Sequence, residues 1–373
     1  MGIRSMVTWT EYYVHCRKGV KLITSFSDIY ICLVALDQCV IFGGAVHSFF
    51  SILHDLSFFF LWMCTPPIWH WKLISALTAE LEEENLFIIM EYAHYMDFED
   101  VRVPQGVHTK ESLHYAWKEF ETRDDDVFNI TYPKSGTTWL QEILSLIYSN
   151  GDAAPVKSTF SWDRVPWLEQ HGGRAQLENR PSPRLITTHL PFHLFPQSFA
   201  KSKAKAIYTI RNPKDVCVSL YYFSKIAQFM ESREDFQDFV SLFLSKDIIF
   251  GRWFEHVKGW LTIKDNPNFL VLSYEDMLKD LRSNVIKISK FLGKELDDVA
   301  IDSVVEHSSF QEMKNNPMSN YSAVPNEIFN KEHGTFHRKG IAGDHKNHFT
   351  PAQEEEFERI YKDCMKDINF SFA

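Results

Sequence analysis

Short apolar stretches alternate with helical patterns along the chain from residue 110 onward. Four stretches are rich in β-branched and aromatic residues, as buried strands are: residues 127–132, 184–189, 204–210 and 269–272. After the first stretch, apolar residues recur at helical spacing from Trp139 to Ile147, and helices are also predicted after the third and fourth. This alternation favours an α/β fold, a single domain in which helices flank a central, mostly parallel sheet on both faces.

The segments between these strands differ in character. Lys110–Phe120, residues 231–263 and Leu278–Phe291 carry apolar residues at helical spacing and are predicted to be helical. Gly151–Pro183 is rich in Pro, Gly and Trp, so we expect a long irregular loop there. Long loops inside a compact domain often carry functional residues.

Residues 1–89 differ from the rest of the chain. Residues 29–71 are dense in large apolar side chains, but charged residues and histidines interrupt them too often for a typical membrane-spanning helix. Three interpretations stay open: an appended or wrongly predicted segment without a firm fold, a membrane-associating hairpin or anchor, and a packed structural extension. Met90 could be an alternative start, so we expect an N-terminal extension at 1–89 and the main domain at 90–373.

Composition narrows the classes of function. Hydrophobic residues make up 45% and aromatic residues 15% of the 373 residues, enough for a sizeable core and an aromatic-lined pocket. The formal net charge of −10 argues against nucleic acid as a partner, because a grip on a phosphate backbone requires a broad basic surface. The six cysteines form no Cys-x-x-Cys pair, which argues against a thiolate zinc site and fits a reducing compartment such as the cytoplasm.

The turn after the first strand has the chemistry of a phosphate site. Pro133–Gly136 lies between a predicted buried strand and a helix N-terminus, where backbone N–H groups and the helix dipole favour an anion. Lys134 adds a positive charge, and hydroxyl groups come from Ser135, Thr137 and Thr138. The lysine precedes Ser-Gly, so this P-loop-like turn departs from the Walker pattern and an ATP-dependent kinase is disfavoured. An ordinary strand-to-helix turn is the remaining alternative.

Two other strand ends carry candidate chemical groups. His189 follows the second strand, at the edge where open α/β sheets place ligands, although a histidine there can equally be a packing or capping residue. Arg211 follows the third strand, and the Asn-Pro pair after it is typical of the start of a helix. Ser219, about two turns into that helix, could face the same anion as Arg211. A surface arginine paired with Asp215 is the alternative.

Six motifs, in order, resemble the cytosolic, PAPS-dependent sulfotransferase family over residues 91–373, with most likeness to its steroid- and amine-acting branches. The motifs are TYPKSGTTW at 131–139, THLP at 188–191, RNPKDVCVS at 211–219, LSYEDM at 272–277, SSFQEMKNNPMSNYS at 308–322 and RKGIAGD at 338–344. The resemblance implies sulfuryl transfer from 3′-phosphoadenylyl sulfate (PAPS) to a hydroxyl or amine of a small apolar acceptor, such as a steroid, phenol or arylamine. PAP would be the product, and no metal ion is implied.

The resemblance also implies roles for individual residues. His189 matches the family's catalytic base, and Lys134 would stabilise the oxygen that leaves with PAP. The residues implied in binding PAPS are Lys134, Ser135, Gly136, Thr137, Thr138, Trp139, Arg211, Ser219, Tyr274, Ser308, Ser309, Phe310, Met313, Phe336, Arg338, Lys339 and Gly340. The acceptor pocket is expected to contain Trp167, Phe223 and Tyr321.

The chain departs from the family pattern at several positions. Thr187 stands where many phenol-acting members have lysine. Pro351 replaces the valine of the family's dimer motif, and because proline lacks a backbone donor, we expect a family-type homodimer to be weakened. Four histidines near the C-terminus include outer pairs spaced like metal ligands: His333, His337, His345 and His348. We expect solvated histidines there rather than zinc, because the segment is loop-like and lies over the nucleotide site that the resemblance implies.

Three other functions stay open. A membrane-anchored Golgi sulfotransferase would use residues 29–71 as its anchor, but the sequon at Asn129 lies on the strand feeding the phosphate loop, where a glycan would prevent folding. A catalytically silent protein would sequester PAP or an apolar ligand, and the presence of both Lys134 and His189 argues against it. A nucleotide kinase would require magnesium-dependent use of ATP, which the loop does not favour.

Overall fold

The computed structural model describes residues 13–16, 19–22, 39–41 and 95–368. The chain divides into two units, Met1–Glu83 and Glu84–Ala373, and each is described by itself. The first unit contains an antiparallel sheet in the order β2-β1-β3, with bounds Tyr13–Cys16 (β1), Gly19–Leu22 (β2) and Cys39–Ile41 (β3). Apart from β3, the candidate membrane segment at 29–71 lies outside the described residues.

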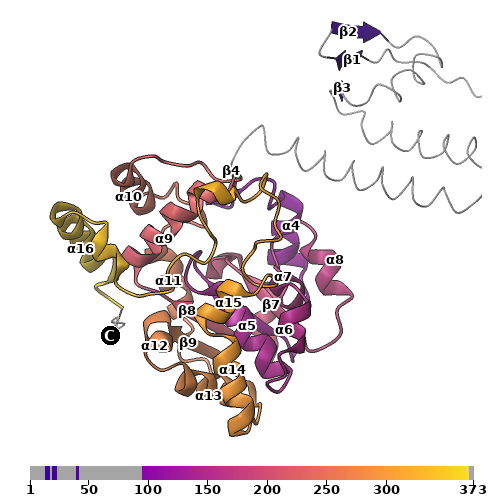
Figure 1. Ribbon diagram of the computed structural model, residues 1–373, viewed down its shortest axis with the longest axis vertical. Coiled ribbons are helices and arrows are strands. Elements are labelled where there is room, and N and C mark those ends of the chain that lie inside the picture. The colour runs from indigo at the N-terminus through magenta and orange to yellow at the C-terminus, as the bar shows by residue number, and fades with distance from the viewer. Residues whose placement is uncertain (1–12, 17–18, 23–38, 42–94, 369–373) are drawn as a thin grey trace, which may run out of the picture. The chain divides into compact units, whose positions relative to one another are not determined.

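The second unit is built on a four-stranded parallel sheet, which confirms the predicted fold class (Figure 1). The strand order is β7-β6-β8-β9, with bounds Val127–Thr131 (β6), Leu185–Thr188 (β7), Lys205–Ile210 (β8) and Phe269–Ser273 (β9). Ile130 of β6 is in register with Thr188 of β7 and with Tyr208 of β8. All four predicted strands are therefore present, and their carboxyl ends share one edge of the sheet.

Helices occupy most of the segments between the strands. The α-helices are Lys110–His114 (α4), Thr137–Tyr148 (α5), Ala154–Ser158 (α6), Ser161–Arg164 (α7), Gly173–Glu178 (α8), Pro213–Ile226 (α9), Phe236–Leu244 (α10), Trp253–Leu261 (α11), Tyr274–Lys279 (α12), Leu281–Leu292 (α13), Asp298–His307 (α14), Phe310–Asn315 (α15) and Pro351–Met365 (α16). The hairpin strands are Tyr95–Phe98 (β4) and Val101–Pro104 (β5), and short turns are Tyr115–Glu119 (η2, a π-helical turn), Phe192–Leu194 (η3), Gln197–Lys201 (η4), Lys331–His333 (η5) and Asp344–Asn347 (η6). In the part of the chain that the structure describes, no helix has the length and apolar character to cross a membrane.

Successive residues of the strands alternate between two hydrophobic clusters, one on each face of the sheet. On β8, Tyr208 packs in a cluster with residues of α9, α10, α11 and α16, whereas Ile207 packs in a second cluster with residues of α5, α13 and α14. On β9, Phe269 likewise lies in the first cluster and Leu272 in the second. Because helices cover both faces, β6 is buried along its whole length, as strands of parallel sheets usually are.

Two predictions of secondary structure differ in detail from the structure. The expected irregular loop at Gly151–Pro183 contains the short helices α6, α7 and α8, which are too short for an apolar repeat to reveal them. The predicted helix Leu278–Phe291 is interrupted at Asp280, whose carboxylate accepts a hydrogen bond from the Ser283 N–H and starts α13. The helices predicted within 231–263 are present as α10 and α11, and left-handed residues, Phe250 among them, turn the chain between the two.

Pro351 occupies the first turn of α16. Its missing N–H costs no helical hydrogen bond there, because the first N–H groups of a helix have no partner within the helix. Thr350 and Gln353 form a reciprocal capping box around it, with hydrogen bonds of 2.7 and 3.3 Å. The proline therefore begins this helix without disrupting it.

Candidate active site

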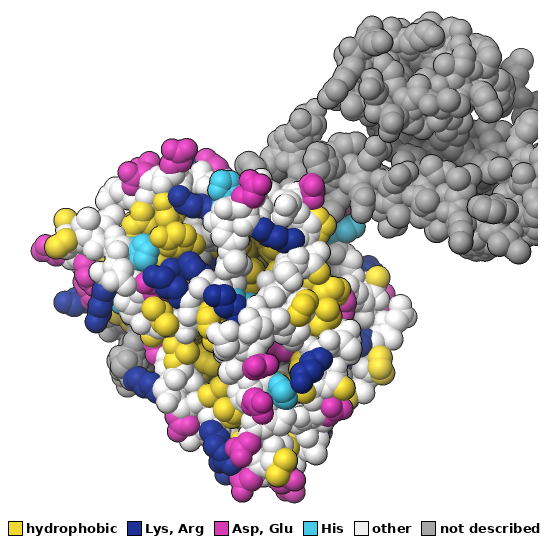
Figure 2. Space-filling model, in the orientation of Figure 1, with side chains coloured by type: hydrophobic (Ala, Val, Ile, Leu, Met, Phe, Trp, Pro, Cys, Tyr) yellow, Lys and Arg dark blue, Asp and Glu magenta, His cyan; other side chains and the backbone are white. Residues whose placement is uncertain are grey.

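The carboxyl ends of the four parallel strands meet at one cavity of about 750 Å³. Lys134 follows β6, His189 follows β7, Arg211 follows β8 and Tyr274 follows β9, and all four line the cavity. Open parallel sheets bind ligands at this edge, and the volume suits a small molecule. In the face drawn in Figure 2, hydrophobic side chains show in hollows of the surface with Lys and Arg side chains beside them.

The turn between β6 and α5 is shaped for the close approach of an anion. Lys134 has a φ of 68° and Gly136 a φ of 101°, so the chain enters the helix through left-handed residues. A Cβ at Gly136 would lie 3.0 Å from the Tyr274 ring, a contact that only glycine avoids without a shift. The helix begins at Thr137, and the N–H groups of its first turn have no partner within the helix. These groups and the helix dipole favour a phosphate or sulfate group.

Buried polar side chains hold this turn against the sheet. Asn129 is fully buried on β6 and donates from Nδ2 to the Thr137 carbonyl oxygen at 3.0 Å. The hydroxyl groups of Thr131 and Thr137 are hydrogen-bonded at 2.7 Å. Because these bonds are already in place, the loop needs little rearrangement to receive a charged group.

Lys134 lies between two aromatic rings. Its Nζ is 4.1 Å from the ring centroid of Phe223 and 4.3 Å from that of Phe336. Burial, together with the nearby positive charges of Arg211 and Arg338, lowers the pKa of Lys134 to about 7. A lysine in this setting gains a proton when an anion binds beside it, because the anion favours its charged form.

His189 is held by hydrogen bonds on its ring and on both sides of its backbone. Nδ1 lies 2.7 Å from the Thr131 carbonyl oxygen, so Nδ1 carries the proton and donates, and Nε2 carries the lone pair. The backbone N–H donates to Oε1 of Glu169 at 2.8 Å, and the carbonyl oxygen accepts from Nε2 of His256 at 3.0 Å. Burial lowers the pKa of His189 to about 3, so its ring is neutral near pH 7.

Arg211 connects the phosphate loop to the C-terminal motif. Its guanidinium donates to the carbonyl oxygens of Lys134 at 2.9 Å and of Ile341 at 3.2 Å. The guanidinium carbon also lies 4.3 Å from the centroid of the Tyr274 ring. Arg211 is buried, which excludes the alternative of a surface arginine.

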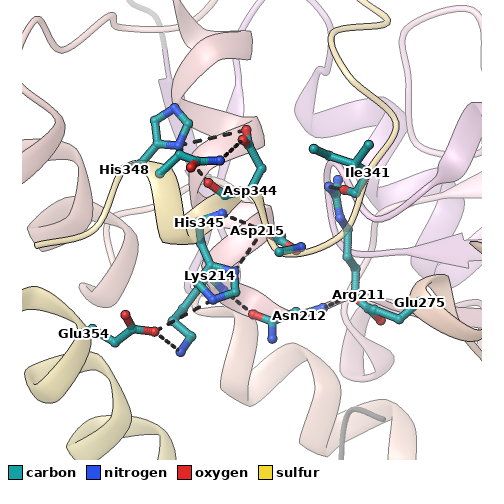
Figure 3. Close-up of polar contacts among 12 residues, drawn as sticks. Arg211, Asn212, Lys214, Asp215, Glu275, Ile341, Asp344, His345, His348 and Glu354 are labelled. Atoms are coloured by element: carbon teal, nitrogen blue, oxygen red, sulfur yellow. Dashed lines mark hydrogen bonds and ion pairs between the residues drawn. The ribbon is translucent and has the colours of Figure 1, made fainter. Parts of the chain in front are cut away.

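The motif at 338–344 is folded around two buried carboxylates, Asp344 and Asp215, which are labelled in Figure 3. Asp344 accepts hydrogen bonds from Arg338 and from Lys339, both at 2.7 Å. Although burial favours the neutral acid, these bonds hold the pKa of Asp344 well below its usual value. Asp215 of α9 accepts a hydrogen bond from the Gly343 N–H at 2.6 Å. Arg338 and Lys339 together outweigh the charge of Asp344, so this end of the cavity suits an anion.

The prediction of solvated histidines near the C-terminus is wrong for most of them. His345 is only 6% exposed, and its Nδ1 lies 3.0 Å from Asp215. His337 and His348 are partly buried and hydrogen-bonded, and His333 is exposed. The spacing in the sequence could not show this, because the partners lie in other segments. Among the described residues, no group of three or more His, Cys, Asp and Glu side chains is arranged to hold a metal ion.

Aromatic side chains form much of the remaining cavity wall. Tyr321 stacks on Phe336 with 3.9 Å between ring centroids, and the Trp167 ring lies 4.7 Å from that of His189. The three residues predicted for the acceptor pocket, Trp167, Phe223 and Tyr321, all line the cavity. Other aromatic residues on the wall are Phe160, Trp162, Phe229, Phe250 and Phe329. Such a wall suits a flat or apolar molecule.

Most residues predicted to bind PAPS lie on this cavity, although their roles remain predictions. Those on its wall are Lys134, Gly136, Thr137, Thr138, Trp139, Arg211, Ser219, Tyr274, Ser309, Phe310, Met313, Phe336, Arg338, Lys339 and Gly340. Ser135 and Ser308 are buried and lie off the wall, and the Ser308 hydroxyl donates to the Val304 carbonyl oxygen. The sequence prediction omitted His108, which lines the cavity, and Glu169, which holds His189, because neither lies in a recognisable motif.

Residues 124–369 match the protein family described as "Sulfotransferase domain". A 3-beta-hydroxysteroid sulfotransferase of Cavia porcellus is 50% identical over 268 residues, which cover 72% of this chain and 93% of that protein. An amine sulfotransferase of Oryctolagus cuniculus is 45% identical over 256 residues, which cover 68% of this chain and 85% of that protein.

Solved structures agree with the fold. A mouse sulfotransferase, SULT7A1, in complex with PAP aligns with a TM-score of 0.64 and 29% identity, over 74% of this chain and 96% of that one. Retinol dehydratase in complex with androsterone and the inactive cofactor PAP aligns with a TM-score of 0.69 and 26% identity, over 78% of this chain and 96% of that one.

Proposed function

The chain belongs to the sulfotransferase domain family and is a sulfotransferase, and from this premise we propose that it moves the sulfuryl group of PAPS to a hydroxyl or amine of a small apolar acceptor. The observation that carries the proposal is the convergence of an anion-binding turn, Lys134 and His189 on one aromatic-walled cavity. The proposed acceptors are steroids, phenols or arylamines. Relatives named for hydroxysteroids and for amines, and a structural neighbour that holds androsterone, support this choice.

PAPS is the proposed donor because two structural neighbours hold PAP. The turn at 133–136 and the first turn of α5 would bind the 5′-phosphosulfate through backbone N–H groups and Lys134. Trp139 would lie near the adenine, and Tyr274 and the segment Ser309–Met313 would contact the nucleotide. The groups proposed for the 3′-phosphate, all of them on the cavity wall, are Arg211, Ser219, Arg338, Lys339 and Gly340.

In the proposed reaction, the acceptor oxygen or nitrogen attacks sulfur in line with the bond to PAP. The bond from the acceptor atom to sulfur forms while the bond from sulfur to the bridging oxygen breaks, and PAP leaves with that electron pair. Nε2 of His189 would take the acceptor's proton, because Nδ1–H is engaged by Thr131. Lys134 and the loop N–H groups would stabilise the charge on the leaving oxygen, and this chemistry requires no metal ion.

We propose that the basicity of His189 depends on bound PAPS, the sulfuryl donor. Burial, with smaller effects of His256, His108 and Lys134, lowers its pKa to about 3, too low for an efficient base near neutral pH. The phosphate and sulfate groups of PAPS would bring several negative charges close to Lys134 and His189, and negative charge raises the pKa of a buried histidine. We therefore infer that the general base becomes effective once the donor is bound.

Sulfate transfer by the full chain from labelled PAPS, against a panel of steroids, phenols and arylamines without added metal, tests the proposal. Turnover of any of these classes is expected. His189→Ala should lower turnover by about 10²- to 10⁴-fold, the usual contribution of general base catalysis, while PAP binding stays near that of the wild type. His193→Ala, at an exposed position nearby, is the control. Tight PAP binding without turnover of any acceptor would favour the silent binding protein, and full turnover in His189→Ala would remove the general-base role.

A cytoplasmic location is part of the proposal. The motifs resemble the cytosolic branch of the family, and the cysteines form no Cys-x-x-Cys pair. Asn129, which begins one of the sequons, is fully buried and hydrogen-bonded to Thr137, so it could not carry a glycan in this fold. Fractionation of cells tests the location, and a glycosidase-sensitive shift in mass would contradict it.

A further inference from the structure

His108 is a buried histidine in a tight turn between β5 and α4. Gly106 allows the turn through a φ of 88°, and the backbone N–H of His108 returns to the carbonyl oxygen of Pro104 at 3.2 Å. Nδ1 of the ring lies 3.0 Å from the same oxygen. The residue is 4% exposed and lines the cavity that holds Lys134 and His189. Its ring is therefore fixed in the wall of the site.

The hydrogen bond to Pro104 determines which nitrogen of His108 carries the proton. A carbonyl oxygen only accepts, so Nδ1 is protonated and the lone pair of the neutral ring lies on Nε2. Burial lowers the pKa of His108 to about 4, which keeps the ring neutral at physiological pH. Nε2 is buried and has no hydrogen-bond partner within residues 95–368. A buried polar atom without a partner is unfavourable, and a hydrogen bond from a ligand is one way to satisfy it.

His108 shares a neighbour with the proposed catalytic base. The Phe250 ring meets His108 edge to face with 5.6 Å between ring centroids, and it meets His189 in the same way at 5.2 Å. Phe250 has a φ of 59°, unusual for a bulky residue, and its N–H is held by the Arg102 carbonyl oxygen at 2.7 Å. The two histidines thus flank one fixed phenyl ring on the cavity wall. Each presents the same tautomer, with Nδ1–H bonded to a carbonyl group.

We propose that His108 is a recognition residue for acceptors with a second polar group, and that its Nε2 accepts a hydrogen bond from a hydroxyl or amine hydrogen on the acceptor. This inference rests on the proposed function, because it takes the reacting group to lie at His189. Val107, Ile249 and Phe250 give the wall near His108 an apolar character, and Gln170 is a further polar side chain on the cavity wall. A ketone or ether oxygen at the same place would meet a lone pair and gain nothing. The site therefore favours a substrate whose second polar group donates a hydrogen bond over one whose second polar group can only accept a hydrogen bond.

Matched pairs of acceptors test the inference. Each pair has one sulfatable hydroxyl and differs only in whether a second position carries a hydroxyl or a keto oxygen, and the second position is varied over steroid and phenol scaffolds. In the wild type, kcat/KM should favour the hydroxyl member of at least one pair by about 2- to 10-fold, the contribution of one hydrogen bond. The preference should not change between pH 6 and pH 8, since His108 stays neutral over that range.

Two variants separate recognition from structure. His108→Phe removes both ring nitrogens, whereas His108→Asn can keep the hydrogen bond to Pro104 and lacks a group at the position of Nε2. Both should lose the preference for the hydroxyl member, whatever their absolute turnover, and PAP binding shows that the variants are folded. His171→Phe, at an exposed histidine of a neighbouring segment, should keep the preference. Absence of any preference in the wild type, or its survival in both His108 variants, would overturn the inference. Absence of turnover with every acceptor would instead count against the proposed function itself.

Discussion

The carboxylate of Asp215 accepts two hydrogen bonds from His345, one from its backbone N–H at 2.9 Å and one from its ring Nδ1 at 3.0 Å (Figure 3). Burial would raise the pKa of Asp215, but hydrogen bonds from His345 and Gly343 and the charge of Arg211 outweigh it and hold the pKa below its usual value. The ring of His345 also faces Glu354 of α16 at 3.8 Å. One carboxylate of α9 thus fixes the end of the segment that carries Arg338 and Lys339.

The anchoring by Asp215 predicts an effect on nucleotide binding. Asp215→Asn removes the charge that organises Gly343 and His345, so the segment with Arg338 and Lys339 should lose its fixed position. Because hydrogen bonds to a charged group contribute about 1.5–3 kcal/mol, PAP affinity should fall by about 10-fold or more. Calorimetric titration with PAP measures the affinity of the variant and of the wild type.

Asp238→Asn is the matched control for Asp215→Asn, because Asp238 is exposed on α10. It should bind PAP like the wild type. Unchanged PAP affinity in a folded Asp215→Asn protein would show that the segment holds its position without this carboxylate.

Gly340 offers a steric test of the same segment. It has a φ of 66°, and a Cβ there would lie 2.2 Å from Cδ2 of Phe310. Gly340→Ala must therefore displace either the loop or the Phe310 ring, both of which line the cavity. We expect PAP binding to weaken strongly in this variant, as measured by the same titration.

Gly172→Ala controls for backbone strain alone. Gly172 has a φ of 86°, but a Cβ there would meet nothing within 4 Å. The left-handed conformation costs an alanine about 1–2 kcal/mol, so both variants should lose stability. Only Gly340→Ala should also lose PAP affinity. Equal PAP affinities in the two variants would contradict the steric argument.

The parts of the site that sequence reasoning predicted are local ones. The strand, turn and helix around Lys134 form from contiguous residues, as do Asn212 and Pro213 at the start of α9, where the Asn212 side chain accepts a hydrogen bond from the Lys214 N–H. Their patterns are visible in any short window. The sequence also predicts that His189 and Arg211 lie beside this turn, because each ends a strand and parallel strands place their carboxyl ends together.

The parts that sequence reasoning missed depend on distant partners. The solvated state expected for His345 is wrong because Asp215, 130 residues away in the chain, buries and binds it. His108 and Glu169 likewise acquire their environments only in the folded protein, one from a tight turn against the cavity and the other from the backbone of His189. No spacing rule within a single segment signals such contacts.

The buried ion pair between Arg184 and Asp126 predicts a large effect on stability. The guanidinium donates to both carboxylate oxygens, at 2.8 and 2.6 Å, and the side chains are 3% and 0% exposed. Arg184→Met leaves an unpaired buried carboxylate, so it should lower the free energy of unfolding by about 3–5 kcal/mol. Urea unfolding measures this change.

Arg282→Met provides the comparison, because Arg282 is 43% exposed and pairs with exposed Asp298 and Asp302. Its effect should stay near about 0–1 kcal/mol. Similar losses in the two variants would mean that the burial of Arg184 does not determine its contribution.

The extent of the cavity predicts that residues 1–89 are dispensable for the reaction. Among the described residues, those on the cavity wall lie between Pro104 and Ile341, and the family match begins at residue 124. A fragment that starts at Met90 should therefore bind PAP and turn over acceptors as the full chain does. Side-by-side assays of fragment and full chain decide the point, and a folded fragment that binds PAP but lacks turnover would assign residues 1–89 a role in the reaction.

The environment of Lys134 predicts that nucleotide binding takes up a proton. Burial and the charges of Arg211 and Arg338 lower the pKa of Lys134 to about 7, from an ordinary value of 10.5. At about pH 8 the amine is therefore mostly neutral in the free protein, and the phosphates of PAP favour its charged form. Binding at that pH should take up as much as one proton. At pH values well below 7 the amine is already charged, so the uptake should disappear.

Calorimetry in buffers of different ionisation enthalpy measures this proton directly. The observed binding enthalpy at pH 8 should vary with the buffer for the wild type and become nearly independent of it in Lys134→Met, which cannot be protonated. Lys118→Met, at an exposed lysine, should behave like the wild type. A wild-type enthalpy that does not depend on the buffer would mean that Lys134 is charged before the nucleotide arrives, and that the aromatic rings of Phe223 and Phe336 offset the cost of its burial.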